Sequence, residues 1–271
     1  MSLYHYTSIE NLALILKNKT IRFSRLDCVD DVEESTVYEN TVPMGKYTFV
    51  SCWTDNEEEC IPLWNLYTPR MKGVRIKMNS SDIFYKYKHK PGIYHTSAGN
   101  VTINAEIETF FTFEEQFNDK YCILSQGVES DDFIRKVEYS KDYKKQSQSA
   151  VNYTFDTGAP FLNVTTREIG KYKNERWAFQ EEVRFVLTIV PTIFNPITGE
   201  IDTVRAIQFG VELPIKFYDL KMNDDAFSSM EITIGPHCSA PDRIIVESLI
   251  KNLNPNATII ESKLQGSLRP R

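Results

Sequence analysis

The stretch FQEEVRFVLTIV, from Phe179 to Val190, constrains the fold of this chain more than any other. Its alternation of apolar and polar residues predicts a strand, since successive side chains of a strand point to opposite faces. One face is apolar, and the other carries an amide, a carboxylate and a guanidinium roughly 7 Å apart along the strand. The apolar face takes Phe179, Glu181, Val183, Phe185 and Leu187, and the polar face takes Gln180, Glu182 and Arg184. The polar face is either a solvated surface with a weak ion pair or a chemical site.

The N-terminal stretch YHYTSIENLALILKNKTIRFS predicts a strand, a capped helix and a second strand. Thr7-Ser8-Ile9-Glu10 fits a capping box, with a hydroxyl at the helix start and a carboxylate three residues later. Apolar residues then recur at helical spacing, at Ile9, Leu12, Ile15 and Leu16. The helix is expected to end at Asn18-Lys19, and Ile21–Ser24 to form the second strand. His5 therefore lies on the first strand.

Further strands and helices follow in mixed order. Strands are expected over 47–53, 73–78 and 257–262, and helices over 57–67, 166–178 and 242–253. Strict alternation of strand and helix is absent from this order, which favours an α+β fold. No linker rich in Pro, Gly or Ser divides the chain, so a single domain over 1–271 is expected. Residues from about 80 to 153 are the least regular part.

Composition limits the kinds of partner and compartment. A net charge of −6 disfavours a broad nucleic-acid surface, because such binding depends on Lys and Arg. The five cysteines are scattered without a CxxC pair, which gives no support to a zinc site and indicates a reducing compartment. No apolar run approaches the ~20 residues of a membrane span, and no export signal is visible. We expect a cytoplasmic protein without a membrane partner.

Several short motifs, taken in order, resemble a large uncharacterised bacterial family, some of whose members are associated with phage defence. The resemblance rests on YHYTS, IENLALIL, IRFS, the acidic DD-x-E loop, a Ser-Cys-Trp strand, LWNLY followed by GVRIKM, Trp177 with Gln180, Glu182 and Arg184, Ile234-Gly235-Pro236, and a C-terminal stretch from Ser262 to Arg269. It spans almost the whole chain, although 79–163 is poorly covered, which implies an insertion at about 80–153.

That family in turn resembles the ADP-ribosyltransferase-like fold, which has split mixed or antiparallel sheets flanked by helices. The resemblance implies an enzyme that uses NAD to modify a macromolecule, in phage defence (abortive infection) or as a toxin with an antitoxin partner. It matches His5 to an NAD-contacting histidine, and Gln180-x-Glu182 to an element with an essential glutamate. Tyr6, Thr7, Ser51, Trp64 and Tyr67 are the further candidates for NAD contact, with Ser51 and Tyr67 as alternatives at the nicotinamide end.

The residue types suit this chemistry. Cleavage of the nicotinamide–ribose bond builds positive charge on the ribose, and a carboxylate at the 2′-hydroxyl stabilises it. Glu182 would do this, Gln180 would position the acceptor, and His5 would contact the adenosine ribose. No metal is required. The alternatives are NAD hydrolysis, a non-catalytic nucleotide- or partner-binding module and, more distantly, an RNA 2′-phosphotransferase.

Each candidate residue also has a structural interpretation. His5 is then a hydrogen-bonded strand histidine, and Trp64 and Tyr67, at helical i,i+3 spacing, are core residues. The acidic cluster Asp30-Asp31-Glu33 is either a cation site or a solvated turn, of which the turn is the more common.

Overall fold

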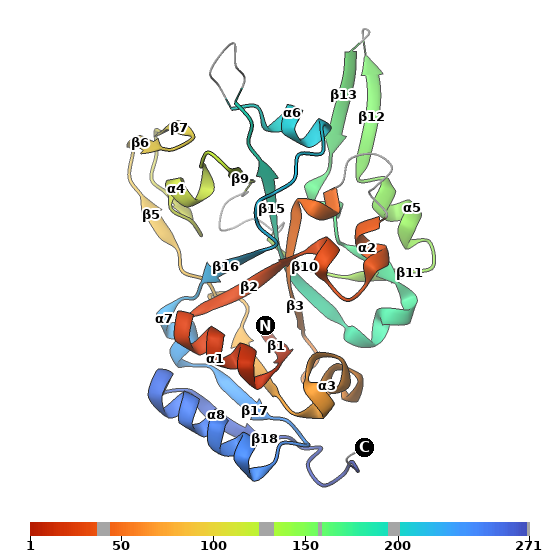
Figure 1. Cartoon of the computed structure of the whole chain (residues 1–271), viewed down its shortest axis with the longest axis vertical. Coiled ribbons are helices and arrows are strands. Elements are labelled where there is room, and N and C mark those ends of the chain that lie inside the picture. Colours follow the sequence, from red (N-terminus) through yellow and green to blue (C-terminus); the bar gives the residue numbers. More distant parts are fainter. Residues whose placement is uncertain (37–43, 125–132, 157–158, 195–200, 270–271) are drawn as a thin grey trace.

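The computed structural model describes residues 1–36, 44–124, 133–156, 159–194 and 201–269. Those residues form a ten-stranded mixed sheet flanked by helices, so the expected α+β class is confirmed (Figure 1). The order through the sheet is β10-β15-β3-β1-β4-β17-β18; β2 also pairs with β3 and β16, and β9 with β15. The strands are β1 (Ser2–Thr7), β2 (Thr20–Arg25), β3 (Thr48–Thr54), β4 (Val74–Asn79), β9 (Tyr121–Leu124), β10 (Ile134–Lys136), β15 (Glu182–Pro191), β16 (Phe217–Lys221), β17 (Glu231–Ile234) and β18 (Thr258–Glu261).

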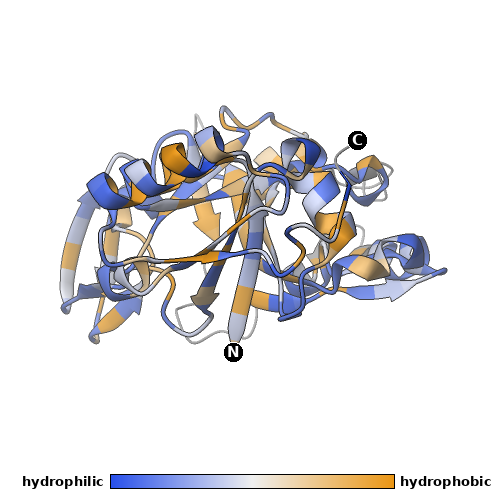
Figure 2. Ribbon diagram, turned by 90° about the horizontal axis from the view of Figure 1, so that it is seen from below, coloured by the Kyte–Doolittle hydropathy of each residue, from blue (hydrophilic) through white to orange (hydrophobic). Residues whose placement is uncertain are grey.

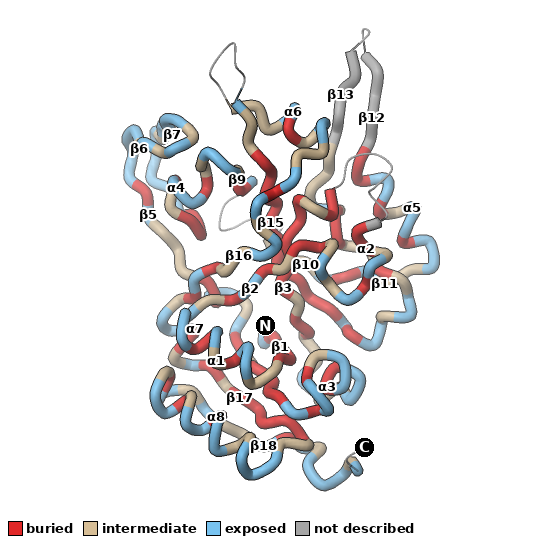
Figure 3. Tube along the Cα trace, in the orientation of Figure 1, coloured by how far each residue is buried: buried red, intermediate tan, exposed pale blue. Residues whose placement is uncertain are grey.

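Helices cover the sheet and bury its strands. The α-helices are α1 (Ile9–Asn18), α2 (Val32–Thr36), α3 (Ile61–Tyr67), α4 (Phe113–Gln116), α5 (Tyr143–Gln148), α6 (Thr203–Gln208), α7 (Asp224–Ser228) and α8 (Ala240–Leu253). The 3₁₀ helices are η1 (Leu26–Cys28), η2 (Met44–Lys46), η3 (Pro69–Met71), η4 (Thr166–Glu168) and η5 (Glu175–Gln180). α1 and α8 contact each other, although the sequence separates them widely (Figure 1). Bands of hydrophobic and hydrophilic residues alternate along the elements (Figure 2), and the central strands are largely buried (Figure 3).

Residues 80–153 add two small sheets and two strands of the large one. β5 (Tyr87–His89) pairs with β8 (Ile107–Thr109), and β6 (Gly92–Thr96) pairs with β7 (Gly99–Ile103). β9 and β10 both pair with β15, so this region is joined directly to the main sheet. β12 (Val151–Asp156) and β13 (Ala159–Val164) form a hairpin, and β11 (Glu138–Ser140) pairs in parallel with β14 (Tyr172–Asn174).

The large sheet divides between β1 and β3. β1 pairs with β4 along its whole length, from Ser2 to Thr7, but with β3 only where Tyr4 faces Thr54. β3 instead pairs with β15 along its whole length, from Thr54 opposite Glu182 to Thr48 opposite Thr188. The two halves of the sheet therefore share one backbone bridge, and they diverge beside it.

The strand predicted over 179–190 begins later than expected, at Glu182. Glu181 has a left-handed backbone, with φ 42°, which is incompatible with a β-strand. The strand therefore cannot extend back through Glu181, and Phe179 and Gln180 belong to η5. The helix predicted over 166–178 is wrong: η4, β14 and η5 occupy that stretch. Gly170, with φ +71°, interrupts it with a turn that a helix does not accommodate. Glu182 and Arg184 do share one face, as predicted from the alternation.

The helix after β1 is capped by Ser8. The Ser8 hydroxyl accepts a hydrogen bond from the backbone N–H of Asn11 at 3.2 Å, and Lys19 closes the C-terminal end in the left-handed conformation. The capping box predicted over Thr7–Glu10 is wrong: Thr7 still pairs with Val74 in the sheet, so Ser8 is the N-cap and Asn11, not a glutamate, is the residue that its hydroxyl bonds.

We expect Ser8→Ala to lower the free energy of unfolding by about 1 kcal/mol, since it leaves an N-terminal amide of α1 without its acceptor. Ser8→Gly is the matched variant and should cost only about a few tenths of a kcal/mol. Urea denaturation measures both. Unchanged stability in Ser8→Ala would show that the hydroxyl does not act as the cap.

Candidate active site

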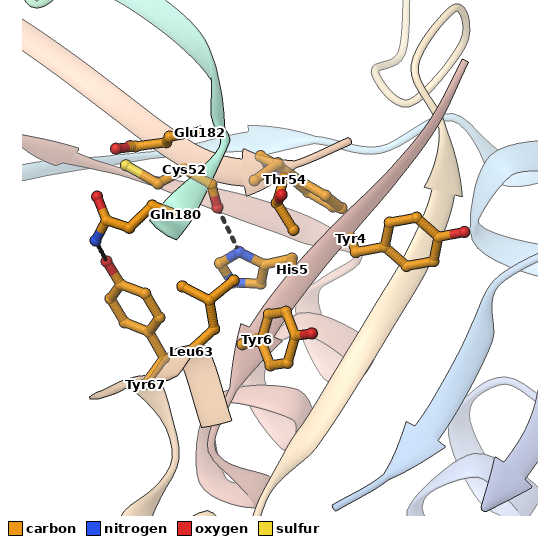
Figure 4. Close-up of a pocket in the computed structure, with 10 residues that line it drawn as sticks. Tyr4, His5, Tyr6, Cys52, Thr54, Leu63, Tyr67, Gln180 and Glu182 are labelled. Carbon is orange, nitrogen blue, oxygen red and sulfur yellow. Dashed lines mark hydrogen bonds between the residues drawn. The ribbon is translucent and has the colours of Figure 1, made fainter. Parts of the chain in front are cut away.

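A pocket lies at the point where β1 and β3 diverge. It encloses about 70 Å³. Its walls come from β1, β3, α3 and the start of β15, and they are formed by Tyr4, His5, Tyr6, Cys52, Trp53, Thr54, Leu63, Tyr67, Gln180 and Glu182 (Figure 4). A second hollow of about 230 Å³ begins behind His5, Tyr6 and Tyr67, which line both, and continues over α1 and β2. The divided sheet thus produces two adjoining cavities.

His5 bridges the divided strands through its side chain. Its Nδ1 lies 2.8 Å from the carbonyl oxygen of Cys52, and its ring lies 5.0 Å from that of Trp53. A carbonyl oxygen only accepts, so Nδ1 carries the proton and Nε2 is the acceptor in the neutral ring. Burial lowers the pKa of His5 below 6.5, and the bond to Cys52 opposes this only in part. His5 is therefore a neutral imidazole at pH 7 with a defined tautomer.

Gln180 and Tyr67 form the opposite wall. The Gln180 amide nitrogen donates to the Tyr67 hydroxyl at 2.7 Å (Figure 4), and that hydroxyl donates to Asp30 Oδ2 at 3.1 Å. Burial above all raises the pKa of Tyr67, and the nearby Cys52, Glu182 and Asp30 add to this, so its hydroxyl stays protonated. In this wall the donor and acceptor of each hydrogen bond are fixed: Gln180 donates to Tyr67, and Tyr67 donates to Asp30.

Glu182 stands at the first position of β15 and is 3% exposed. Arg184 binds it through two contacts, Nε to Oε1 at 2.6 Å and Nη2 to Oε2 at 3.0 Å. Burial would raise the pKa of Glu182, but Arg184 and Lys173 outweigh that effect and lower it to about 2. The interpretation of this strand face as a solvated surface with a weak ion pair is therefore wrong, because the pair is buried.

Two further charged side chains complete what we call the buried charge cluster: Glu34, Lys173, Glu182 and Arg184. Arg184 also binds Glu34 through Nη1 to Oε1 at 2.6 Å and Nη2 to Oε2 at 2.9 Å. Its remaining N–H meets the Gly170 carbonyl at 2.8 Å, so all five guanidinium donors are used. Two carboxylates and two cations balance in a space from which water is excluded, which is the condition for burying charge.

The other predicted NAD-contacting residues are placed differently. Tyr6 lines both cavities and accepts from the Cys60 amide at 3.0 Å, and Thr7 lines only the second hollow. Ser51 does not line either one: it faces Phe185 across the ladder, on the side of β3 away from Glu182, and accepts from the Trp53 indole. Of the two residues proposed for the nicotinamide end, only Tyr67 reaches the pocket.

Trp64 is a core residue, as its structural interpretation proposed. Its side chain is fully buried, its ring meets that of Tyr6 edge-on at 4.9 Å, and its indole N–H donates to Glu59 at 3.0 Å. It packs with Leu63 and Met71 in a small cluster under α3. The core position predicted from the i,i+3 spacing is confirmed for Trp64. Tyr67, one turn later in α3, lines the pocket instead.

The sequence does not single out Lys173, Glu34 or Cys52. Lys173 falls in the stretch predicted as a helix over 166–178, but it lies in the short strand β14 and is 1% exposed. Glu34 follows the acidic cluster Asp30-Asp31-Glu33, and α2 places it beside Arg184 at 3% exposure. No sequence signal separates these two from the surface charges around them, since each depends on contacts between distant segments.

The acidic stretch before α2 is only partly a solvated turn. Asp31 is 5% exposed and Asp30 accepts from Tyr67, while Glu33, in the first turn of α2, is half-exposed and accepts from the Tyr143 hydroxyl. No group of three potential metal-ligating side chains occurs among the described residues. None of the helices in the described ranges has the length and apolar character needed to cross a bilayer. Neither a family model, nor a curated protein, nor a solved structure matches this chain.

We expect Glu34→Gln to destabilise the fold by about 3 kcal/mol, because it leaves two buried cations with one carboxylate. The neighbouring Glu33→Gln changes a half-exposed carboxylate and should cost much less. Chemical denaturation of both variants at pH 7 measures the difference. Similar small losses would mean that the cluster is far more hydrated than its burial indicates.

The lowered pKa of Glu182 also predicts an acid dependence. A carboxyl group whose pKa is about 2 in the folded state and 4.5 in the unfolded state stabilises the fold above pH 4.5, and that contribution is lost as the pH falls toward 2. Unfolding free energies measured between pH 6 and pH 2 test this. The dependence should be weaker in Glu182→Gln, and an unchanged curve in that variant would assign it to other carboxyl groups.

Proposed function

We propose that this protein is an NAD-dependent ADP-ribosyltransferase with an ADP-ribosyltransferase-like fold, acting on a macromolecule in phage defence or as a toxin. One observation carries the proposal: His5, from the start of the chain, lines a single pocket with Gln180 and Glu182 where the sheet divides. The five free cysteines favour a reducing, cytoplasmic setting. An antitoxin partner belongs to the same proposal.

The two cavities suit the two ends of a dinucleotide. The nicotinamide-ribose end would enter the pocket beside Glu182 and Tyr67. The adenosine end would lie in the second hollow, with His5 and Tyr6 at the junction that both cavities share. A neutral His5 with Nε2 as acceptor suits a ribose hydroxyl as donor.

Glu182 retains the capacity that the chemistry needs. A carboxylate has about four acceptor sites. Arg184 fills two of them and Lys173 a third, at 3.3 Å. The fourth is approached by the Cys52 thiol, whose pKa burial raises well above 9.0, so it is a neutral and weak donor. A ribose 2′-hydroxyl is the stronger donor and would displace it, which places a negative charge next to the developing cation.

One observation favours a second candidate, a non-catalytic module of the same fold that binds a nucleotide. Both oxygens of Glu182 already accept from Arg184, so the carboxylate has a structural role before any ligand binds. A binder would hold NAD in the two cavities without releasing nicotinamide. Calorimetry with NAD, combined with a turnover assay, separates the candidates.

The central test is incubation of the protein with labelled NAD and cell extract. Wild-type protein should transfer label to a macromolecule, and Glu182→Gln should reduce transfer about 1000-fold, as removal of a main electrostatic stabiliser does. Glu181→Gln is the matched control, since this exposed neighbour points away from the cluster toward Asn56, and it should keep full activity.

The products decide among the alternatives. Free ADP-ribose without labelled macromolecule would replace the transferase by an NAD glycohydrolase. Bound NAD without any nicotinamide release would favour the non-catalytic module. Equal transfer by wild type and Glu182→Gln would remove Glu182 from the mechanism.

A further inference from the structure

Lys173 lies between the two proposed catalytic side chains. Its Nζ donates to Gln180 Oε1 at 2.8 Å and to Glu182 Oε2 at 3.3 Å. Glu34 Oε2 is 3.4 Å away. An ammonium group has three N–H donors, and here three oxygen atoms from three side chains surround it. The position of this one cation is thus tied to both Gln180 and Glu182.

We propose that Lys173 is a positioning residue that fixes Gln180 and Glu182 in their reactive orientations, an inference that rests on the proposed function. Lys173 is absent from the residues that line either cavity, so it acts through its neighbours and does not touch the substrate. Its side chain is 1% exposed, and the ring of Trp177 lies 4.7 Å from the ammonium.

Lys173 helps to fix which way the Gln180 amide points. The amide has an acceptor end and a donor end, and only the acceptor end can face an ammonium. With Oε1 held by Lys173, the NH₂ group faces Tyr67 and the pocket. Tyr67 takes one of its hydrogens, and the second remains for an acceptor nucleophile or a ribose oxygen. Tyr67 favours the same orientation, because its hydroxyl donates to Asp30 and accepts from the amide, so loss of Lys173 removes one of the two contacts that fix the amide.

Lys173 also holds the charge on Glu182. In the cluster two carboxylates face two cations, and removal of Lys173 leaves Arg184 shared by Glu34 and Glu182. The pKa of Glu182 is lowered to about 2 against the effect of burial, with Arg184 and then Lys173 as the main causes. Loss of Lys173 therefore moves that pKa upward. The groups facing Glu182 from every packed element are His5, Glu34, Cys52, Tyr67, Tyr139, Lys173 and Arg184.

Stability does not by itself identify the role of this lysine. Removal of Lys173 alone leaves two buried carboxylates with one cation, so Lys173→Met is expected to lower the stability of the fold, as Glu34→Gln does. The ammonium differs from an apolar group in what it orients. A positional role is therefore distinguishable from a structural one by measuring turnover and stability in the same variant.

The test compares Lys173→Met with Lys171→Met, the surface lysine that precedes β14 and pairs with Glu138 and Glu168. In Lys173→Met, nicotinamide release should fall about 100-fold, as for a misplaced catalytic group, while the dissociation constant for NAD changes less than about threefold. The acid limb of its pH–rate profile should move up by about one pH unit or more. Lys171→Met should match the wild type in all three measurements.

Chemical rescue keeps the test decisive if the methionine variant folds poorly. Lys173→Ala leaves a space that fits propylamine, which carries the missing side-chain atoms and the charge. Propylamine should raise nicotinamide release by about tenfold or more, and propanol, of similar size without charge, should not. Rescue by both compounds, or by neither, overturns the proposal.

The remaining outcomes separate the two levels of inference. Wild-type protein that releases no nicotinamide overturns the proposed function, and the positioning role with it. Active wild-type protein with an equally active, unshifted Lys173→Met overturns the positioning role alone and leaves the proposed function standing. A variant that loses NAD binding as strongly as turnover, and is not rescued by propylamine, assigns Lys173 a purely structural role.

Discussion

The buried pairing of Arg184 with Glu34 and Glu182 is the interaction on which the rest of the structure depends. The guanidinium uses every one of its N–H groups, on two carboxylates and one backbone carbonyl. It thereby joins α2, β15 and the turn at Gly170, segments far apart in the sequence. Because an unpaired buried charge is costly, the charged groups of these segments are stable in the interior only when all of them are in place.

The divided sheet leaves a pocket beside the buried charge cluster. β1 and β3 share a single backbone bridge. Beside it, the Cys52 carbonyl accepts a hydrogen bond from the His5 imidazole and not from the backbone of β1. The same divergence leaves space beside Glu182, at the start of β15. A continuous sheet would have filled that space with paired backbone. The site is thus a consequence of strand topology together with one buried ionic network.

The sequence predicted the elements whose signal is local. The alternation around Glu182 and Arg184 gave the shared face of β15, and the apolar periodicity gave α1 and α8 within a few residues. The resemblance to a known family, and not a local pattern, grouped His5 with Gln180 and Glu182, and these three residues do line one pocket. The resemblance to an ADP-ribosyltransferase-like fold stays a prediction, because no comparison tests it.

What the sequence did not predict depends on non-local contacts. Lys173 sits in a stretch whose charge pattern is typical of an exposed helix, and only the pairing of β14 with β11 turns it inward. Glu34 looks like its surface neighbours until α2 packs against β15. Ser51 and Cys52 are adjacent in the sequence, and the register of β3 against β15 alone decides which of them faces Glu182. Such choices follow from register and packing, which periodicity does not encode.

The single bridge between Tyr4 and Thr54 has a mechanical consequence. Among the described strands no other backbone pairing joins β1 to β3, so a rotation of one half about this point leaves both remaining ladders intact. The width of the gap is then set by side-chain contacts, among them the imidazole bond to Cys52 and the bond between Gln180 and Tyr67 across the pocket. A ligand larger than the cavity would have to displace these contacts, whereas the ionic network lies on the β15 side and would keep its geometry.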